Sequence, residues 1–149
     1  MEEIKQEFSV SPVKSTLGEE MPNLQFFENR IQAGFPSPAQ HEYADSIDLN
    51  KALISNPAAT FCARVMGDSM VEAGINEGDL LVIDRSLTPH DGCIAVCFVD
   101  GEFTVKRLNI RPDGIYLTPA NASYPELAVS QDSNFTVWGV VSFIVKKLE

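Results

Sequence analysis

The chain has 149 residues, of which 44% are hydrophobic and 21% are charged, and its formal net charge at pH 7 is −10. This length suits one domain with a buried core, and the composition is that of a globular protein rather than a disordered one. Because an acidic surface repels phosphate groups, we expect protein partners and no direct binding of nucleic acid.

The apolar runs are all far shorter than the roughly 20 residues that a membrane-spanning helix needs. The first residues, MEEIKQEF, are charged and lack the apolar core of a signal peptide. We therefore expect a cytoplasmic protein that does not contact a membrane. The three cysteines, Cys62, Cys93 and Cys97, lie in apolar contexts and are expected to be small buried hydrophobic residues without a disulfide.

The first third of the chain carries few clear signals. Residues 1–34 show no strong periodicity, and Leu24 to Ile31 (LQFFENRI) is predicted to form a short helical turn. Pro36 and Pro38 remove two amide donors, which favours an extended backbone in this stretch. Ser46 to Pro57 is predicted to contain one short helix.

From Ala59 onward, short apolar runs separated by Gly, Asp, Asn and Pro turns are typical of an all-β domain. DLLVID is a continuous apolar run, as expected of a strand buried on both faces. Asp100-Gly101 predicts a hairpin because both residues tolerate positive φ. FTVWGVVSFIV predicts a long final strand with a bulge at Gly139. The predicted fold is mostly β, a small, strongly bent antiparallel sheet or partly closed barrel with an extended N-terminal arm.

A serine follows the strand predicted for TFCARVM, in the sequence GDSM from Gly67 to Met70. Neither of the two histidines, His41 and His90, is near it in the sequence, so a nucleophilic Ser69 needs another base. Lys106 lies among apolar residues on the strand after the hairpin. A buried ammonium is costly, and burial lowers the lysine pKa toward the range of a general base.

Ser69 and Lys106 are therefore candidates for a Ser-Lys pair, a known variant of the Ser-His-Asp triad. Other interpretations stay open, in which Lys106 reaches water from a sheet edge and Ser69 is an ordinary turn residue. Asp79 and Asp84 bracket an apolar strand, but a metal site would need more oxygen ligands. We expect no metal and no cofactor.

Several motifs occur together in one order: GDSM, then GINEGDLLVID, then DGEFTVKRL. In this the chain resembles the self-cleaving Ser-Lys proteins of the bacterial SOS response, which include the LexA repressor, phage repressors and the UmuD/MucA mutagenesis proteins. AGFPSPAQ and NPAAT make the UmuD/MucA branch the best match. The resemblance covers roughly residues 30–149.

The resemblance implies roles for individual residues. Ser69 matches the nucleophile and Lys106 the general base, and the backbone amides of Asp68 and Ser69 match the oxyanion hole. The Ala33-Gly34 bond matches the bond that the family cleaves within its own chain. Three parts follow: an arm of residues 1–33 that self-cleavage removes, a linker with a short helix in residues 34–58, and a β-rich Ser-Lys peptidase and dimerisation domain in residues 59–149.

The resemblance also implies partners. These are a second copy of the chain in a homodimer, a RecA–single-stranded DNA filament that stimulates self-cleavage, and a UmuC-like Y-family DNA polymerase that takes up the trimmed product for error-prone translesion synthesis. Repressor activity is not expected, because the 33 residues before Gly34 are too few for a helix-turn-helix domain. Two other classes stay open: a cytosolic signal-peptidase-like protease acting on other proteins, and a noncatalytic dimerisation module.

Overall fold

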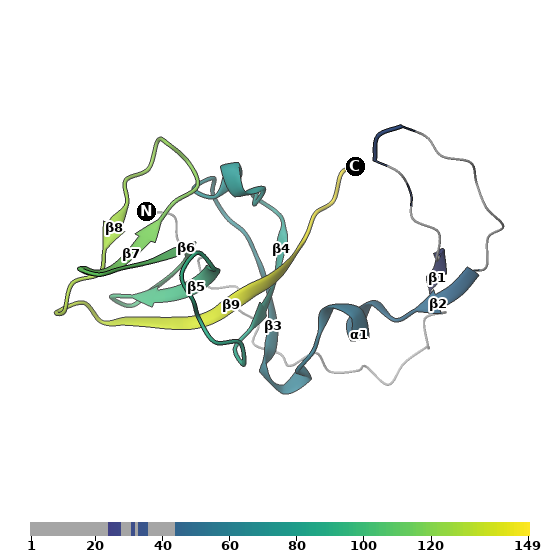
Figure 1. Cartoon of the computed structure of the whole chain (residues 1–149), viewed down its shortest axis with the longest axis horizontal. Coiled ribbons are helices and arrows are strands. Elements are labelled where there is room, and N and C mark those ends of the chain that lie inside the picture. The colour runs from purple at the N-terminus through teal and green to yellow at the C-terminus, as the bar shows by residue number, and fades with distance from the viewer. Residues whose placement is uncertain (1–23, 28–30, 32, 36–43) are drawn as a thin grey trace. The chain divides into compact units, whose positions relative to one another are not determined.

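The computed structural model describes residues 24–27, 31, 33–35 and 44–149. These residues belong to two compact units, which Figure 1 shows in one view. We call Ser15–Ser55 the arm unit and Asn56–Glu149 the sheet unit. Within the described residues, no helix is both long enough and apolar enough to cross a bilayer.

In the arm unit, β1 (Leu24–Phe27) pairs antiparallel with β2 (Ala44–Ile47). The helical turn predicted from Leu24 is therefore wrong for these four residues. Phenylalanine favours strands, and β2 supplies a partner for the backbone that a single-sequence pattern does not reveal. The extended stretch predicted around Pro36 and Pro38 lies outside the described residues.

Helix α1 (Leu49–Leu53) is shorter than the stretch in which we expected a helix. Its start is set by Asp48, whose Oδ1 accepts hydrogen bonds from the amides of Asn50 at 3.0 Å and Lys51 at 3.4 Å. A carboxylate at this position satisfies amides that have no partner within the helix.

The sheet unit holds one antiparallel sheet of seven strands in the order β3-β4-β9-β5-β6-β7-β8, which confirms the mostly β fold. Two short 3₁₀ helices, η1 and η2, lie outside the sheet. The elements are η1 (Pro57–Ala59), β3 (Thr60–Arg64), η2 (Val71–Ala73), β4 (Leu80–Asp84), β5 (Ile94–Val99), β6 (Glu102–Arg111), β7 (Gly114–Thr118), β8 (Leu127–Ala128) and β9 (Phe135–Val145).

The hairpin between β5 and β6 turns at Asp100 and Gly101, as the sequence predicts. Their φ angles are 48° and 88°, both in the left-handed region that this turn requires. The turn sets the register, so that Val96 lies opposite Val105 and Ala95 opposite Lys106.

Side chains on both faces of the sheet are buried in apolar clusters. Val96 and Val105 belong to one cluster, whereas Ala95 and Leu108 belong to the other. Because successive residues of a strand point to opposite faces, these clusters cover opposite sides of β5 and β6. A lysine at position 106 therefore has an apolar core on either side of its strand.

The long strand β9 is bent by two irregularities. Gly139 lies opposite Val96 and Val137 lies opposite Cys97, so Trp138 is an extra residue in the pairing with β5. This confirms a bulge beside Gly139. A Cβ atom at Gly139 would lie 2.6 Å from Cγ2 of Ile83, so β9 can lie this close to β4 only with glycine there. A second register shift follows in the pairing with β4.

All three cysteines are free thiols. Cys93 and Cys97 are buried as predicted, but Cys62 is exposed, so the expectation for Cys62 is wrong. It lies on β3, a strand at one end of the sheet, and alternates with the buried Ala63. Arg64, on the same face of this outer strand, is also exposed, whereas Thr60 at its start is buried.

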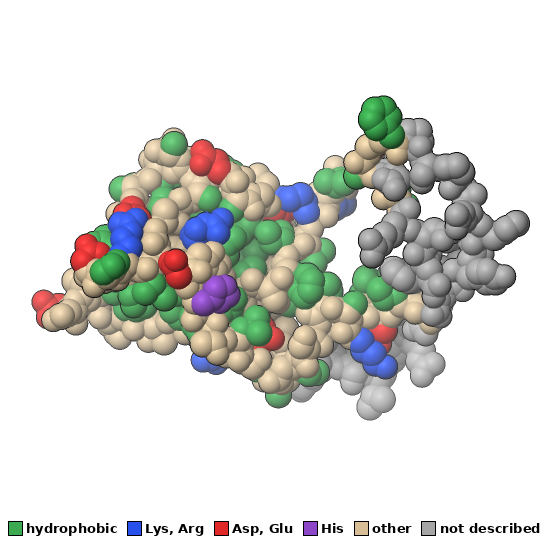
Figure 2. Space-filling view, viewed as in Figure 1, with side chains coloured by type: hydrophobic (Ala, Val, Ile, Leu, Met, Phe, Trp, Pro, Cys, Tyr) green, Lys and Arg blue, Asp and Glu red, His purple; other side chains and the backbone are tan. Residues whose placement is uncertain are grey.

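The surface of the sheet unit mixes charges of both signs. On the face visible in Figure 2, Lys and Arg side chains lie beside Asp and Glu side chains and form no continuous basic patch among the described residues. This arrangement agrees with the net charge of −10 and gives no support to a nucleic-acid interface on that face.

Candidate active site

Ser69 lies in the loop between β3 and η2, which we call the Ser69 loop (residues 65–70). Gly67 has φ of 87°, a conformation that glycine adopts without strain, and it turns the chain after β3. Met70 anchors the end of the loop in the core with 2% of its surface exposed. Ser69 is also 2% exposed, so its hydroxyl faces the protein interior rather than solvent.

Lys106 extends from β6 to this hydroxyl and is 8% exposed. Its Nζ lies 2.7 Å from Oγ of Ser69, 3.0 Å from Oγ1 of Thr104 and 3.1 Å from the carbonyl oxygen of Val105. The burial of Lys106 excludes a side chain that reaches water from the sheet edge. Ser69 does lie in a turn, but its side chain is buried. The structure thus brings the two predicted residues into direct contact.

This arrangement suits proton transfer from serine to lysine. A neutral lysine amine keeps two N–H groups and one lone pair. If the N–H groups donate to Thr104 and to the Val105 carbonyl, the lone pair points toward Ser69 and can accept its proton. The same three oxygens stabilise the ammonium that forms, because a charged donor strengthens each hydrogen bond. Thr104 is a functional candidate that the sequence analysis did not single out, although it lies on the same strand face as Lys106.

A thiol lies close to this pair but is a poor competitor for Ser69. Cys97 is opposite Thr104 in the β5–β6 register. Burial raises the pKa of the Cys97 thiol to about 12, so this thiol is neutral near pH 7. Since the thiolate is the reactive form of cysteine, Ser69 is the better nucleophile of the two.

The Ser69 loop is held in place by the connection between β7 and β8. The side-chain amide of Asn121 donates to the Asp68 carbonyl at 2.9 Å, and the Tyr124 hydroxyl donates to Oδ1 of Asp68 at 2.6 Å. The amide of Ala120 donates to the sulfur of Met70 at 3.3 Å. Sequence reasoning missed Asn121 and Tyr124, because they are more than fifty positions from the loop and belong to no motif.

A cavity of about 140 Å³ opens beside Lys106. Its lining is mostly apolar and comes from β6, β7 and the segment that leads into the first residue of β8. The lining residues are Thr104, Lys106, Leu117, Tyr124, Pro125, Glu126 and Leu127. A space of this size and character fits a small apolar side chain next to Lys106.

The other predicted site residues lie in different parts of the chain. Asp68 and Ser69, whose backbone amides are predicted to form the oxyanion hole, are neighbours in the Ser69 loop. Ala33 and Gly34, the predicted cleavage site, are both exposed in the arm unit. Exposure is what a peptide bond needs in order to enter an active site.

The two aspartates that bracket β4 have partners within the protein. Asp79 accepts hydrogen bonds from Lys146 and from the Asn76 amide. Asp84 accepts from the amide and the hydroxyl of Ser86. Both are structural carboxylates at the ends of a strand.

Residues 25–142 match the family model described as peptidase S24-like. Protein ImpA of Salmonella typhimurium is 46% identical over 121 residues, which cover 81% of this chain and 82% of ImpA. Protein MucA of Salmonella typhimurium is 42% identical over 121 residues, covering 80% of this chain and 82% of MucA. The LexA repressor of Stenotrophomonas maltophilia is 38% identical over 111 residues, covering 74% of this chain and 52% of the repressor.

Proposed function

Because the chain belongs to the peptidase S24-like family, we propose that it is a self-cleaving serine peptidase with Ser69 as nucleophile and Lys106 as general base. The observation that carries the proposal is the 2.7 Å contact between Lys106 Nζ and Ser69 Oγ, which both side chains make while buried. A buried lysine with this contact is suited to accept the serine proton.

The proposed reaction follows from these contacts. The neutral amine of Lys106 takes the hydroxyl proton while Oγ of Ser69 attacks the carbonyl carbon of Ala33. The amides of Asp68 and Ser69 stabilise the negative oxygen of the tetrahedral intermediate. The Lys106 ammonium then gives its proton to the departing amide nitrogen of Gly34. A water molecule, deprotonated by the same amine, hydrolyses the ester that joins Ala33 to Ser69.

The Ala33-Gly34 bond is the proposed cleavage site for chemical reasons beyond the resemblance. An alanine side chain fits the small apolar cavity beside Lys106. A glycine after the bond lets the backbone approach Ser69 closely. In this proposal residues 1–33 are an arm that is removed, residues 34–58 are a linker with a short helix, and residues 59–149 are the peptidase and dimerisation domain.

The biological setting we propose is SOS mutagenesis in the bacterial cytoplasm. Similarity to ImpA and MucA over most of the chain supports this setting. The proposed partners are a second copy of the chain, a RecA–single-stranded DNA filament that stimulates cleavage, and a UmuC-like Y-family polymerase that binds the trimmed form. The net charge of −10 favours such protein partners over direct contact with DNA.

The decisive experiment is incubation of the purified full-length chain at alkaline pH, with mass spectrometry of the products over time. We expect one new fragment that begins at Gly34, formed faster when RecA filaments on single-stranded DNA are added at neutral pH. A chain that stays intact under both conditions, or a cut at another bond, contradicts the proposal.

A further inference from the structure

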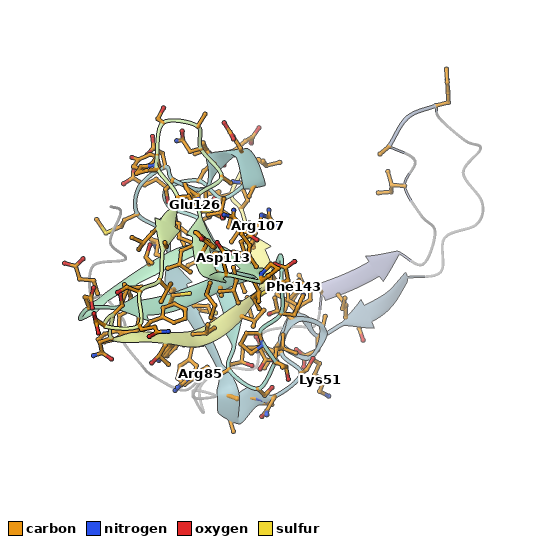
Figure 3. The ribbon with its side chains drawn as sticks, turned by 60° about the vertical axis from the view of Figure 1, so that its left-hand side comes forward. Lys51, Arg85, Arg107, Asp113, Glu126 and Phe143 are labelled. Carbon is orange, nitrogen blue, oxygen red and sulfur yellow. The ribbon has the colours of Figure 1, made fainter. Side chains whose placement is uncertain are left out.

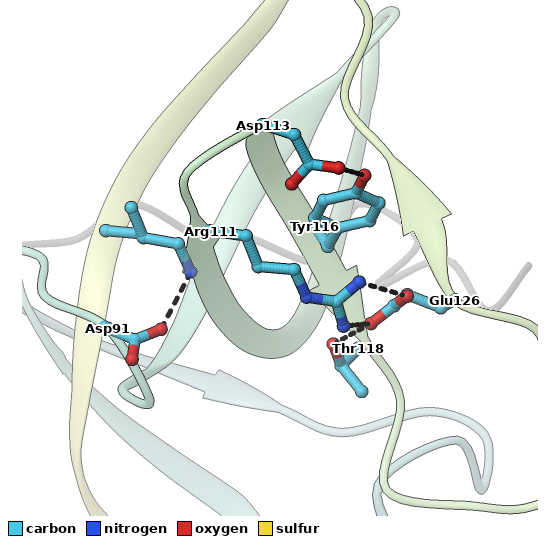
Figure 4. A network of polar contacts seen from close by, with 7 residues as sticks. Asp91, Arg111, Asp113, Tyr116, Thr118 and Glu126 are labelled. Carbon is cyan, nitrogen blue, oxygen red and sulfur yellow. Dashed lines mark hydrogen bonds and ion pairs between the residues drawn. The ribbon is translucent and has the colours of Figure 1, made fainter.

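A cluster of polar side chains around Glu126 lies outside the Ser69–Lys106 contact (Figure 4). Arg111 donates two hydrogen bonds to the Glu126 carboxylate, at 3.0 Å from Nη1 and 2.5 Å from Nη2. The hydroxyl of Thr118 donates a third, at 2.8 Å. The pair therefore has the bidentate geometry that makes arginine–carboxylate contacts strong and directional.

The guanidinium of Arg111 is itself held in one orientation. Its Cζ atom lies 4.1 Å from the centre of the Tyr116 ring, and the Tyr116 hydroxyl donates to Oδ2 of Asp113 at 2.8 Å. The side chains of Arg111 and Glu126 are 39% and 32% exposed, and exposed ion pairs are usually weak. Stacking on the ring orders this arginine in advance, so less side-chain entropy is lost when the pair forms.

The pair is charged in the pH range in which the peptidase would act. Hydrogen bonds from Arg111 and Thr118 hold the pKa of Glu126 below its ordinary value of 4.5. A lowered carboxylate pKa means that the pair is fully formed at neutral and alkaline pH and is lost only in acid.

Glu126 belongs to the segment that walls the cavity beside Lys106. Tyr124, Pro125, Glu126 and Leu127 all line this cavity. Alternation along β6 puts Arg111 on the sheet face opposite to Lys106, so the pair holds the segment from the outside. At its other end the segment is held by the Tyr124 bond to Asp68. Strand β8, which follows, pairs with β7 over two residues and is a weak support by itself.

We propose that Arg111 and Glu126 are positioning residues for self-cleavage, which clamp the segment Tyr124–Leu127 so that the cavity keeps its shape around the residue before the scissile bond. The inference rests on the proposed function. Without the clamp the wall of the cavity moves, and the scissile carbonyl is no longer held at attack distance from Ser69. A displacement of about 1 Å at a reacting centre can lower a rate by up to about a hundredfold.

The test uses the full-length chain and two readouts. One is the plateau rate of self-cleavage at alkaline pH together with its apparent pKa. The other is the rate at which a small fluorophosphonate probe labels Ser69, which needs the Ser-Lys pair but not a filled cavity. We expect Arg111→Ala and Glu126→Ala each to lower the plateau rate about tenfold. The apparent pKa and the labelling rate should stay at wild-type values.

Arg107 provides a matched control. It lies on the same face of β6 as Arg111 and donates to the Gly92 carbonyl at 2.9 Å. Figure 3 labels Arg107, Asp113 and Glu126, which lie in the same region of the sheet unit. Arg107→Ala removes the same charge from the same strand, and we expect it to cleave at the wild-type rate.

A charge swap, Arg111→Glu with Glu126→Arg, should recover most of the lost rate because it rebuilds the pair in reverse. If an alanine variant fails to fold, Glu126→Gln replaces it, since a glutamine oxygen can still accept from Thr118. Wild-type cleavage by the alanine variants, or an equal loss of labelling and cleavage, overturns the clamp but leaves the proposed function standing. A wild-type chain that neither cleaves itself nor takes up the probe contradicts the proposed function instead.

Discussion

Oγ1 of Thr104 lies 3.0 Å from Nζ of Lys106, two positions away along β6 on the same face of the strand. This hydroxyl accepts a hydrogen bond from the Lys106 amine and so turns the amine toward Ser69. With the Val105 carbonyl, which is part of the backbone, Thr104 fixes the direction of the lone pair. Only one of these two supports can be removed by a side-chain substitution.

Thr104→Val keeps the shape of the side chain and removes the hydroxyl. We expect the plateau rate of self-cleavage to fall by a factor of about ten to a hundred, because the amine is no longer aimed at Ser69. The apparent pKa should fall as well, since the ammonium loses a charge-assisted hydrogen bond. A pH–rate profile checks both effects.

Thr104→Ser keeps a hydroxyl at this position and should stay close to the wild-type rate. Equal rates in the valine and serine variants would contradict the role of the Thr104 hydroxyl in orienting Lys106.

The pH dependence of self-cleavage tests the role of Lys106. The reaction needs the neutral amine, so the rate should rise with pH and level off once Lys106 is deprotonated. Because Lys106 is 8% exposed, we expect the midpoint to lie below the roughly 10.4 of a free lysine. Lys106→Arg should be inactive at every pH, since guanidinium does not lose its proton in this range. A rate that does not change between neutral and strongly alkaline pH argues against Lys106 as the base.

Ser69→Ala should abolish cleavage and leave the fold intact. The alanine removes one of three acceptors around Lys106, and Thr104 and Val105 remain. We expect the free energy of unfolding to fall by no more than about 2 kcal/mol, the size of one hydrogen bond to a charged group. Mass spectrometry after a long alkaline incubation and urea unfolding measure the two effects. Any fragment that begins at Gly34 in this variant rules out Ser69 as the nucleophile.

Much of the sheet unit could be predicted from local patterns. The Asp100-Gly101 turn sets the β5–β6 register, and alternation from that turn puts Lys106 between two apolar layers. Burial of DLLVID and the bulge beside Gly139 follow from the same kind of reasoning. Each depends on residues close together in sequence, whose conformations are limited by φ preference and by the period of the strand.

The site could be predicted only in part. The motifs point to Ser69 and Lys106, but the contacts from Asn121 and Tyr124 to Asp68 join segments more than fifty positions apart. No local pattern encodes such a contact. The strand β1 was missed for a similar reason, because its partner β2 lies about twenty positions away and a four-residue strand has no clear periodicity by itself.

The contact between Asp79 and Lys146 predicts how stability changes in acid. The hydrogen bond from Lys146 is the main cause that lowers the pKa of Asp79 below its ordinary 3.8. A carboxyl group whose pKa is lower in the folded chain than in the unfolded chain stabilises the fold at pH values above its unfolded pKa. This contribution is lost as pH falls through the folded pKa. Lys146→Ala should therefore be less stable than wild type at pH 7, and the gap should close below about pH 3.8. Urea unfolding at several pH values measures this, with Lys147→Ala as the control. A gap that stays constant into acid contradicts the assignment.

Gly34→Glu should block self-cleavage without changing the Ser-Lys pair. Gly34 is exposed in the arm unit, and a Cβ atom there would meet nothing within 4 Å, although its φ of 159° is one that residues with a side chain rarely adopt. We expect the block to arise when the bond enters the cavity beside Lys106, where a glutamate has to lose its water against an apolar wall. We expect the variant to stay full length at alkaline pH and with RecA filaments, while its Ser69 still reacts with a fluorophosphonate at the wild-type rate.

Gly34→Ala, which adds a methyl group and no charge, should cleave slowly rather than not at all. Processing of the glutamate variant at wild-type speed would place the scissile bond elsewhere in the arm, and loss of labelling would show that the substitution acts on the dyad.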